Sequence, residues 1–204
     1  MSIQWINRLK KFIKTTYIIK IKSKGSLQMR KLFKHLIKIT KHKYYVCHAC
    51  FKIGLYWKGL KHDLSKYMPS ELIPSVKYFQ DTSSPIDAEK AAVGYSMAWQ
   101  HHKRANSHHW EYWLDYKDGE LITIKMPLKE VLELVCDWIG AGKAYNTTQW
   151  TNNTPYAYWI KNQSKFHFHP ETKILINTIL FDIKENGWDC ISLIIRSGFY
   201  KNIY

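Results

Sequence analysis

Histidine and aspartate side chains that could hold a metal ion occur at five places between residues 42 and 137. Imidazole nitrogens and carboxylate oxygens are standard ligands for zinc, iron, manganese and similar ions. The sharpest feature is the adjacent pair His62-Asp63, because both side chains can reach one ion, although such a dipeptide by itself also occurs by chance. The candidate ligands, in chain order, are His42, His62, Asp63, His101, His102, His108, His109 and Asp137.

The densest of these places is the segment AWQHHKRANSHHWEYW, residues 98–113, which holds two pairs of histidines. Successive residues of a helix point about 100° apart, so normally only one member of each pair faces a given site. Which histidine of each pair would be a ligand stays open from the sequence. Glu111 follows the second pair and could orient a ligating histidine or assist proton transfer.

Asp137 lies in the middle of an apolar helical stretch, LVCDWIGAGKAY. Helical periodicity places Leu134 and Ala141 on the same face, which predicts that Asp137 points inward. A buried carboxylate is costly unless it is paired or bound to a metal ion. Asp137 is therefore a candidate ligand rather than an ordinary surface residue.

The elements that must position these residues are predicted to be helices. The chain has only 9 glycines and 6 prolines, which favours long helices over a turn-rich β sandwich. The fold class is therefore expected to be all-α. We expect one helix after a break at Gly25-Ser26 and further helices over about residues 88–104, from His108 and from Pro127. An extended or hairpin excursion is expected over 115–127, and a loop is expected over 147–164.

The order of the candidate ligands, with Lys66 following in the string HDLSK, resembles the HD-domain superfamily of metal-dependent phosphohydrolases over about residues 40–140. The resemblance implies an HD-domain-like helical bundle that binds one or two divalent transition-metal ions (Mn, Zn, Fe or Co). A second ion would be held by one histidine from each of the pairs His101/His102 and His108/His109, and Asp63 would bridge it to the first ion. The implied ligands of the first ion are His42, His62, Asp63 and Asp137.

The same resemblance implies hydrolysis of a nucleotide or related phosphate ester by water that the metal activates. Lys66, one turn after Asp63, would meet the substrate phosphate. The expected catalytic residues are Asp63, Lys66 and Glu111, and the expected substrate-binding residues are Lys66, Lys103, Arg104 and Asn106.

A closer resemblance covers most of the chain. The strings HKYYV, GLYWKGLKHDLSKYMPSE, AWQHHKRANSHHWEYW and HPET are similar to those of an uncharacterised family of small bacterial and phage proteins of unknown function. This family brings no established activity, and residues 1–30 lie outside the resemblance. We therefore expect a basic N-terminal segment over 1–30, either an amphipathic helix or an extension, and an HD-like helical domain over 31–204.

Charge is distributed unevenly along the chain. Residues 1–62 contain 16 Lys and Arg and no Asp or Glu, whereas residues 63–204 contain 15 basic and 16 acidic residues. This division favours an anionic partner for residues 1–62, such as nucleic acid, a membrane surface or a polyphosphate substrate. A solvated lysine-coated helix face would explain the same pattern.

The first 21 residues are not expected to span a membrane, because lysines interrupt every apolar run. A surface-lying amphipathic helix stays open, since apolar residues recur there at helical spacing. These residues are Trp5, Leu9, Phe12 and Ile13. The expected location is the cytoplasm of a bacterium or of a phage-infected host cell.

Three functions are compatible with these patterns. The first is a metal-dependent phosphohydrolase. The second is a non-enzymatic protein that binds nucleic acid or a membrane and in which the His/Asp cluster is structural. The third is an HD-fold di-iron oxygenase, because a few HD-fold proteins use a similar His/Asp set. Metal identity separates the first from the third, and a salt-dependent affinity for nucleic acid would favour the second.

Overall fold

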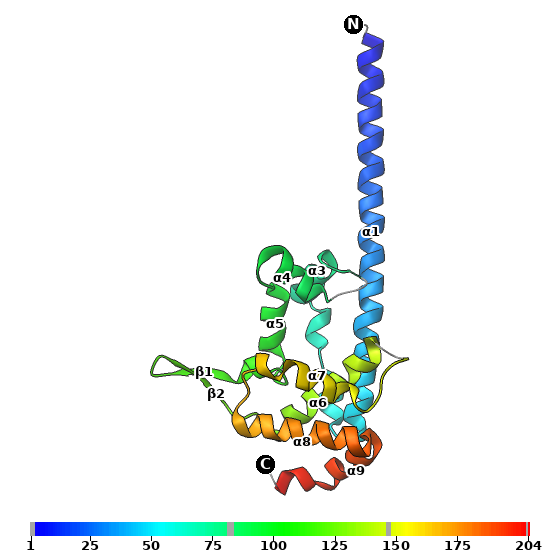
Figure 1. Cartoon of the computed structure of the whole chain (residues 1–204). Helices are drawn as coiled ribbons and strands as arrows, with labels where there is room; N and C mark the ends of the chain where they lie inside the picture. The colour runs from blue at the N-terminus through cyan, green and yellow to red at the C-terminus, as the bar shows by residue number, and fades with distance from the viewer. Residues whose placement is uncertain (1–2, 81–83, 146–147, 203) are drawn as a thin grey trace.

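The computed structural model describes residues 3–80, 84–145, 148–202 and 204, and for residues 3–24 and 202 it describes the backbone only. Its longest element is α1 (Ile3–Lys52), whose N-terminal part extends well beyond the other helices (Figure 1). The remaining helices are α2 (Tyr56–Lys61), α3 (Pro69–Lys77), α4 (Pro85–Val93), α5 (Met97–Ala105), α6 (Leu128–Tyr145), α7 (Thr154–Asn162), α8 (Pro170–Asn186) and α9 (Trp188–Ser197).

Short 3-10 helices and one hairpin complete the described fold. The 3-10 helices are η1 (Leu64–Tyr67), η2 (Trp110–Trp113), η3 (Gln163–Lys165) and η4 (Phe199–Asn202). The hairpin pairs β1 (Leu114–Lys117) with β2 (Glu120–Thr123) in antiparallel register. Asp118 and Gly119 connect the two strands with positive φ angles of 54° and 84°, as a tight hairpin turn requires. The predicted helical fold class and the predicted excursion are both confirmed.

The close contact between α1 and α6 organises the core. Gly140 on α6 lies against Val46 on α1, and a β-carbon at Gly140 would overlap a methyl group of Val46. Both residues are buried, and Val46 belongs to the same core cluster as the apolar side chains of α8. One turn before this contact, α1 carries His42 and α6 carries Asp137, so the crossing point sets how these two residues meet.

Two predicted boundaries are wrong in the first half of the chain. No break occurs at Gly25-Ser26: α1 is continuous there and crosses residue 30 without interruption. A glycine inside a helix costs about 1 kcal/mol relative to alanine but does not end the helix unless it adopts a left-handed conformation. The single helix expected over 88–104 is two helices instead, because Gly94 ends α4 with a φ of 86°.

The loop expected over residues 147–164 is also wrong. It contains α7, which begins at Thr154 with a proline in its first turn, a position that proline favours. Trp159 of α7 is completely buried in the core, so tertiary packing outweighs the poor helix propensity of the surrounding Thr and Asn residues.

In the described part of the chain, no helix combines the length and the apolar character needed to cross a membrane. The predicted amphipathic face of the N-terminal segment lies outside the described residues. Its members are the side chains of Trp5, Leu9, Phe12 and Ile13.

Candidate metal centre

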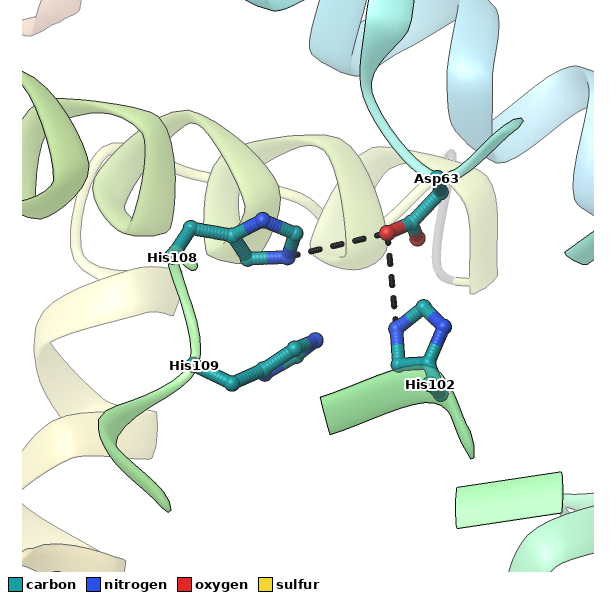
Figure 2. Close-up of side chains that lie close together, drawn as sticks. All are labelled: Asp63, His102, His108 and His109. Atoms are coloured by element: carbon teal, nitrogen blue, oxygen red, sulfur yellow. Dashed lines mark ion pairs between the residues drawn. The ribbon is translucent and has the colours of Figure 1, made fainter. Parts of the chain in front are cut away.

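Seven of the eight candidate ligands converge in the interior of the fold, where they form two groups that share Asp63, and Figure 2 shows the second of these groups. In each group the possible ligand atoms lie within 4.8 Å of one another. The side chains come from α1, α5, α6 and two short connecting segments. The first group is His42, His62, Asp63 and Asp137, and the second is Asp63, His102, His108 and His109.

In the first group, Asp137 and the Oδ2 atom of Asp63 face two histidines. The Nε2 atom of His42 lies 3.0 Å from Asp137 Oδ1 and 3.7 Å from Asp63 Oδ2. The Nε2 atom of His62 lies 3.3 Å from each of these oxygens. All four side chains are buried or nearly so.

In the second group, the other oxygen of Asp63 faces the middle histidines. Asp63 Oδ1 lies 3.4 Å from Nε2 of His102 and 3.6 Å from Nε2 of His108. The ring of His109 points into the space that the other three side chains enclose (Figure 2). Burial, together with His108 and His102, lowers the pKa of His109 well below its ordinary value, so its ring stays neutral and keeps a lone pair for a metal ion.

The two histidine pairs behave differently because only one of them is helical. His101 and His102 lie on α5, and His102 points inward whereas His101 is 43% exposed and contacts Glu71 instead. The prediction that His101 is a ligand is therefore corrected, since it belongs to neither group. His108 and His109 lie in a turn before η2, not in the helix that the sequence predicts, and both of them face the site.

The backbone at Asp63 explains how two neighbouring residues reach the same centre. α2 ends at Lys61, and Asp63 adopts a left-handed conformation with φ 53° and ψ 26°. This conformation is uncommon and unfavourable for a residue other than glycine, and such strain concentrates at functional sites. It turns the chain so that the side chains of His62 and Asp63 both point into the cluster.

The possible ligand atoms of these side chains are suited to a bound cation, because many of them have no hydrogen-bond partner. Buried polar atoms are normally hydrogen bonded, so a concentration of unpaired ones needs a reason. Neighbouring atoms are close but not aligned for hydrogen bonds. Among the described residues, the buried side-chain atoms without a hydrogen-bond partner include His42 Nε2, His62 Nε2, Asp63 Oδ1, His108 Nε2 and His109 Nε2, whereas Asp63 Oδ2 forms an ion pair with Lys66.

Electrostatics keeps the two carboxylates in the form that binds metal. Burial alone would raise the pKa of Asp63, but His62 and Lys66 hold it well below its ordinary value. Burial would likewise raise the pKa of Asp137, and the nearby rings of His42 and His62 hold it well below its ordinary value. Metal ions bind ionised carboxylates, so the site needs no deprotonation of these groups at neutral pH.

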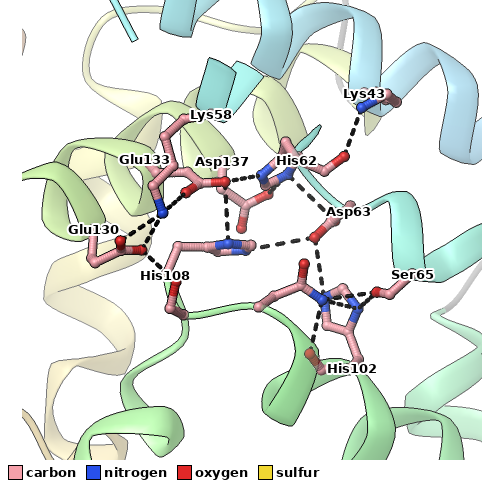
Figure 3. Close-up of polar contacts among 12 residues, drawn as sticks. Lys43, Lys58, His62, Asp63, Ser65, His102, His108, Glu130, Glu133 and Asp137 are labelled. Atoms are coloured by element: carbon pink, nitrogen blue, oxygen red, sulfur yellow. Dashed lines mark hydrogen bonds and ion pairs between the residues drawn. The ribbon is translucent and has the colours of Figure 1, made fainter. Parts of the chain in front are cut away.

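Two buried glutamates that the sequence reasoning missed support the ligand rings, and Figure 3 shows one of them, Glu133. Glu133 Oε1 lies 3.0 Å from Nδ1 of His62 and 3.5 Å from Nδ1 of His108, so one oxygen serves one histidine of each group. Glu71 Oε2 lies 2.9 Å from Nδ1 of His102. A carboxylate on Nδ1 fixes the tautomer that leaves Nε2 free for a metal ion. Helical spacing could have identified Glu133 from the sequence, because it lies one turn before Asp137 on the same helix.

A third possible group, formed by Glu133 with the Nδ1 atoms of His62 and His108, is a poor metal site. The ammonium of Lys58 lies 2.9 Å from Glu133 Oε2 and 2.6 Å from Glu130, so a cation already occupies this side of the cluster (Figure 3). Like charges at such distances repel, and a metal ion there would have to displace the lysine. Glu133 therefore serves as a hydrogen-bond acceptor.

Replacing Glu133 by Gln should weaken metal binding at both groups by about 10- to 100-fold, because the neutral amide polarises the two rings less strongly. The measurement is a competition titration of purified protein against a chelator of known affinity. The matched control is Glu130→Gln, since Glu130 also pairs with Lys58 but contacts neither His62 nor His108. Equal affinities for the two variants would rule out a role of Glu133 in ligand orientation.

A cavity of about 790 Å³ opens directly onto the cluster. Both groups contribute to its wall, and so does Lys66, whose ammonium lies 2.5 Å from Asp63 Oδ2. Glu111 also lines it, with one buried carboxylate oxygen that has no hydrogen-bond partner, and burial raises the pKa of Glu111. Much of the remaining wall is aromatic: Trp99, Trp110, Trp138, Tyr145, Tyr158 and Phe166.

Three predicted substrate-binding residues are not among those that line this cavity. Lys103 and Arg104 lie at the end of α5, and Arg104 is exposed. The side-chain amide of Asn106 donates to Ser65 Oγ and to the carbonyl of His102, both at 2.8 Å. Asn106 therefore ends α5 and ties it to η1, which helps to position His102.

Comparisons with known proteins identify a family without an activity. A model described as "Family of unknown function (DUF5662)" matches residues 31–182. Neither the curated proteins nor the solved structures contain a match to the chain.

Proposed function

Because this chain belongs to the DUF5662 family of unknown function, its activity must be argued from the site, and we propose a metal-dependent phosphohydrolase acting on a nucleotide or a related phosphate ester. The observation that carries the proposal is the buried carboxylate of Asp63, each oxygen of which faces a separate group of ligand side chains. A carboxylate shared in this way is suited to two neighbouring ions. The resemblance of the ligand order to HD-domain phosphohydrolases supports the same function.

The chemistry that divalent ions supply in such a site is Lewis-acid polarisation of a phosphoryl oxygen and activation of water near neutral pH. Lys66 reaches the cluster from the cavity side, where its ammonium would neutralise charge on the phosphoryl oxygens. Burial alone would lower the pKa of Lys66, but Asp63 and Asp137 raise it above its ordinary value, so the ammonium stays charged. Glu111 lines the same cavity, and burial raises its pKa, which is the direction that favours a general acid for the leaving group.

The cavity suggests the size and character of the substrate. Its volume of about 790 Å³ suits a nucleotide-sized ligand. Trp99, Trp138 and Phe166 line the same cavity as Lys66 and the ligand cluster, so a base could pack on an aromatic ring while a phosphate meets the cluster. Aromatic and cationic side chains in one cavity together favour a phosphate ester with an aromatic group over inorganic polyphosphate.

Metal content and hydrolysis of a panel of nucleotides and aryl phosphates should be measured on the same preparations. We expect Lys66→Ala to retain the metal but to lose about 10²- to 10³-fold in kcat/KM, because it removes one charged donor from the transition state. Lys129→Ala is the matched control, since Lys129 is exposed on α6 and lies outside the cavity.

Three outcomes would contradict the proposal. Unchanged hydrolysis by the Lys66 variant would remove Lys66 from the mechanism. Iron with a visible absorption band and no phosphatase activity would favour an oxygenase. No metal after reconstitution with manganese, zinc, iron and cobalt would indicate that the cluster is structural.

A further inference from the structure

The outward face of α1 carries large apolar side chains along the stretch in which the inward face is buried. Phe33, Ile37 and Tyr44 are 60%, 67% and 64% exposed, and Phe51 continues the series. Intervals of four and seven residues place these side chains on one face of a helix. The residues that α1 buries against the body, such as Ile39, alternate with them on the opposite face.

The apolar surface continues onto α2. The ring of Phe51 contacts Tyr56 at the start of α2, with ring centroids 5.2 Å apart. The next residue, Trp57, is 75% exposed, and Leu60 one turn later is 47% exposed. Singly exposed apolar residues are ordinary, but a row that joins two helices indicates an interaction surface. We call these residues the α1–α2 face: Phe33, Ile37, Tyr44, Phe51, Trp57 and Leu60.

The charged residues that α1 and α2 contribute around the α1–α2 face are all basic, and Asp189 and Glu130 of other helices pair with Lys52 and Lys58 at its border. Arg30 and Lys41 are exposed beside the apolar row, one turn from Phe33 and Ile37, respectively. No acidic residue occurs anywhere in residues 1–62. A partner must therefore offer both a negative surface and a place for apolar side chains.

The combination of basic and exposed apolar side chains favours some classes of partner over others. A second copy would set two predominantly basic faces against each other, which is unfavourable. Nucleic acid would satisfy the basic residues but would leave the aliphatic side chains of Ile37 and Leu60 without suitable contacts. The surface of an anionic bilayer satisfies both, since apolar side chains enter the boundary between headgroups and acyl chains while basic ones contact lipid phosphates.

We propose that the α1–α2 face docks this protein, with α1 lying flat, on the surface of a membrane that contains anionic phospholipids. The arrangement of the fold permits this for the N-terminal part of α1, which stands clear of the other helices (Figure 1). The cavity is lined by Ile39 and His42 from the opposite face of α1, so docking leaves the candidate metal centre uncovered. The proposal does not depend on the reaction that the site performs.

The test is co-sedimentation of the full chain with vesicles of phosphatidylcholine alone and of phosphatidylcholine containing phosphatidylserine. We expect binding to the second kind only, weakened by salt, and reduced about tenfold or more by the double substitution Phe33→Ser/Ile37→Ser. The matched control is Tyr116→Ser/Leu121→Ser, which removes two exposed apolar side chains from the hairpin and should leave binding unchanged. Far-UV circular dichroism checks that both double variants keep their helices.

Several results would overturn the proposal. One is equal binding of wild type and the Phe33/Ile37 variant to phosphatidylserine vesicles. Another is no vesicle binding together with salt-sensitive binding of duplex DNA or RNA, which would assign the basic residues to nucleic acid. A third is a concentration-dependent dimer in sedimentation analysis that the Phe33/Ile37 substitution dissociates, which would assign the α1–α2 face to a second copy of the chain.

Discussion

Asp63→Asn should abolish binding of both metal ions together and lower the rate of phosphate-ester hydrolysis by about 10³-fold or more, since several kcal/mol of transition-state stabilisation would be lost. The physical reason is that Asp63 is the one side chain common to both ligand groups, with Oδ2 facing His62 and Oδ1 facing His102. An amide is nearly the same size as the carboxylate but lacks its charge and can offer only one oxygen.

Asp137→Asn is the comparison variant, because it should affect one ligand group and not both. Asp137 belongs to the first group only, where it contacts His42 and His62. We therefore expect its substitution to remove one ion and to leave the group around His102, His108 and Asp63 able to bind the other. Inductively coupled plasma mass spectrometry gives the metal content of both variants, and circular dichroism checks their folding. Retention of a metal ion by the Asp63 variant would show that the two groups do not share this residue.

Gly140→Ala should lower both the thermal stability of the protein and the metal affinity of the first group. A β-carbon at this position would overlap Val46 Cγ2 and would lie 2.9 Å from the backbone nitrogen of Val46, so α6 would have to move away from α1. Overpacking of this kind costs about 1–3 kcal/mol, which corresponds to a fall in Tm of roughly 3–10 °C for a chain of this size.

The same displacement of α6 from α1 should also move ligand side chains, because each helix carries one of them near the crossing point. His42 lies one turn before Val46 on α1, and Asp137 lies one turn before Gly140 on α6, so a wider crossing lengthens the 3.0 Å contact between His42 and Asp137. Differential scanning calorimetry and chelator competition measure the two effects. The control is Gly25→Ala, where nothing lies within 4 Å of the added carbon and helix propensity predicts a neutral or slightly stabilising change. If Gly140→Ala lowered Tm but left metal affinity intact, the crossing point would not control the site.

Much of the fold was predictable because its signals are local. Helices over most of the chain follow from apolar residues at helical spacing and from few helix-breaking residues. The hairpin follows from Asp118-Gly119 between two short extended segments. The errors have a common cause: Gly25 and the Thr/Asn-rich segment around Trp159 have weak intrinsic preferences, and tertiary context or helix continuity outweighs such preferences.

The chemical composition of the candidate site was also readable from residue types. Histidine and aspartate have few other reasons to recur in apolar helical segments, which is why His42, Asp63 and Asp137 stand out in the sequence. The sequence alone did not show that both His108 and His109 face the site, because helical periodicity does not apply in the turn that holds them. It likewise did not identify Glu133 as an acceptor for two ligand rings.

What the sequence by itself determined is thus the set of chemical groups, their helical supports and the charge of residues 1–62. Only the tertiary structure decided which groups meet. Periodicity relates residues three or four positions apart, whereas Glu133 approaches His62 across 71 positions and Asp137 approaches His42 across the crossing of two helices. These meetings depend on how closely α1 and α6 pack at Gly140 and on the left-handed turn at Asp63, which are properties of the assembled core rather than of any one segment.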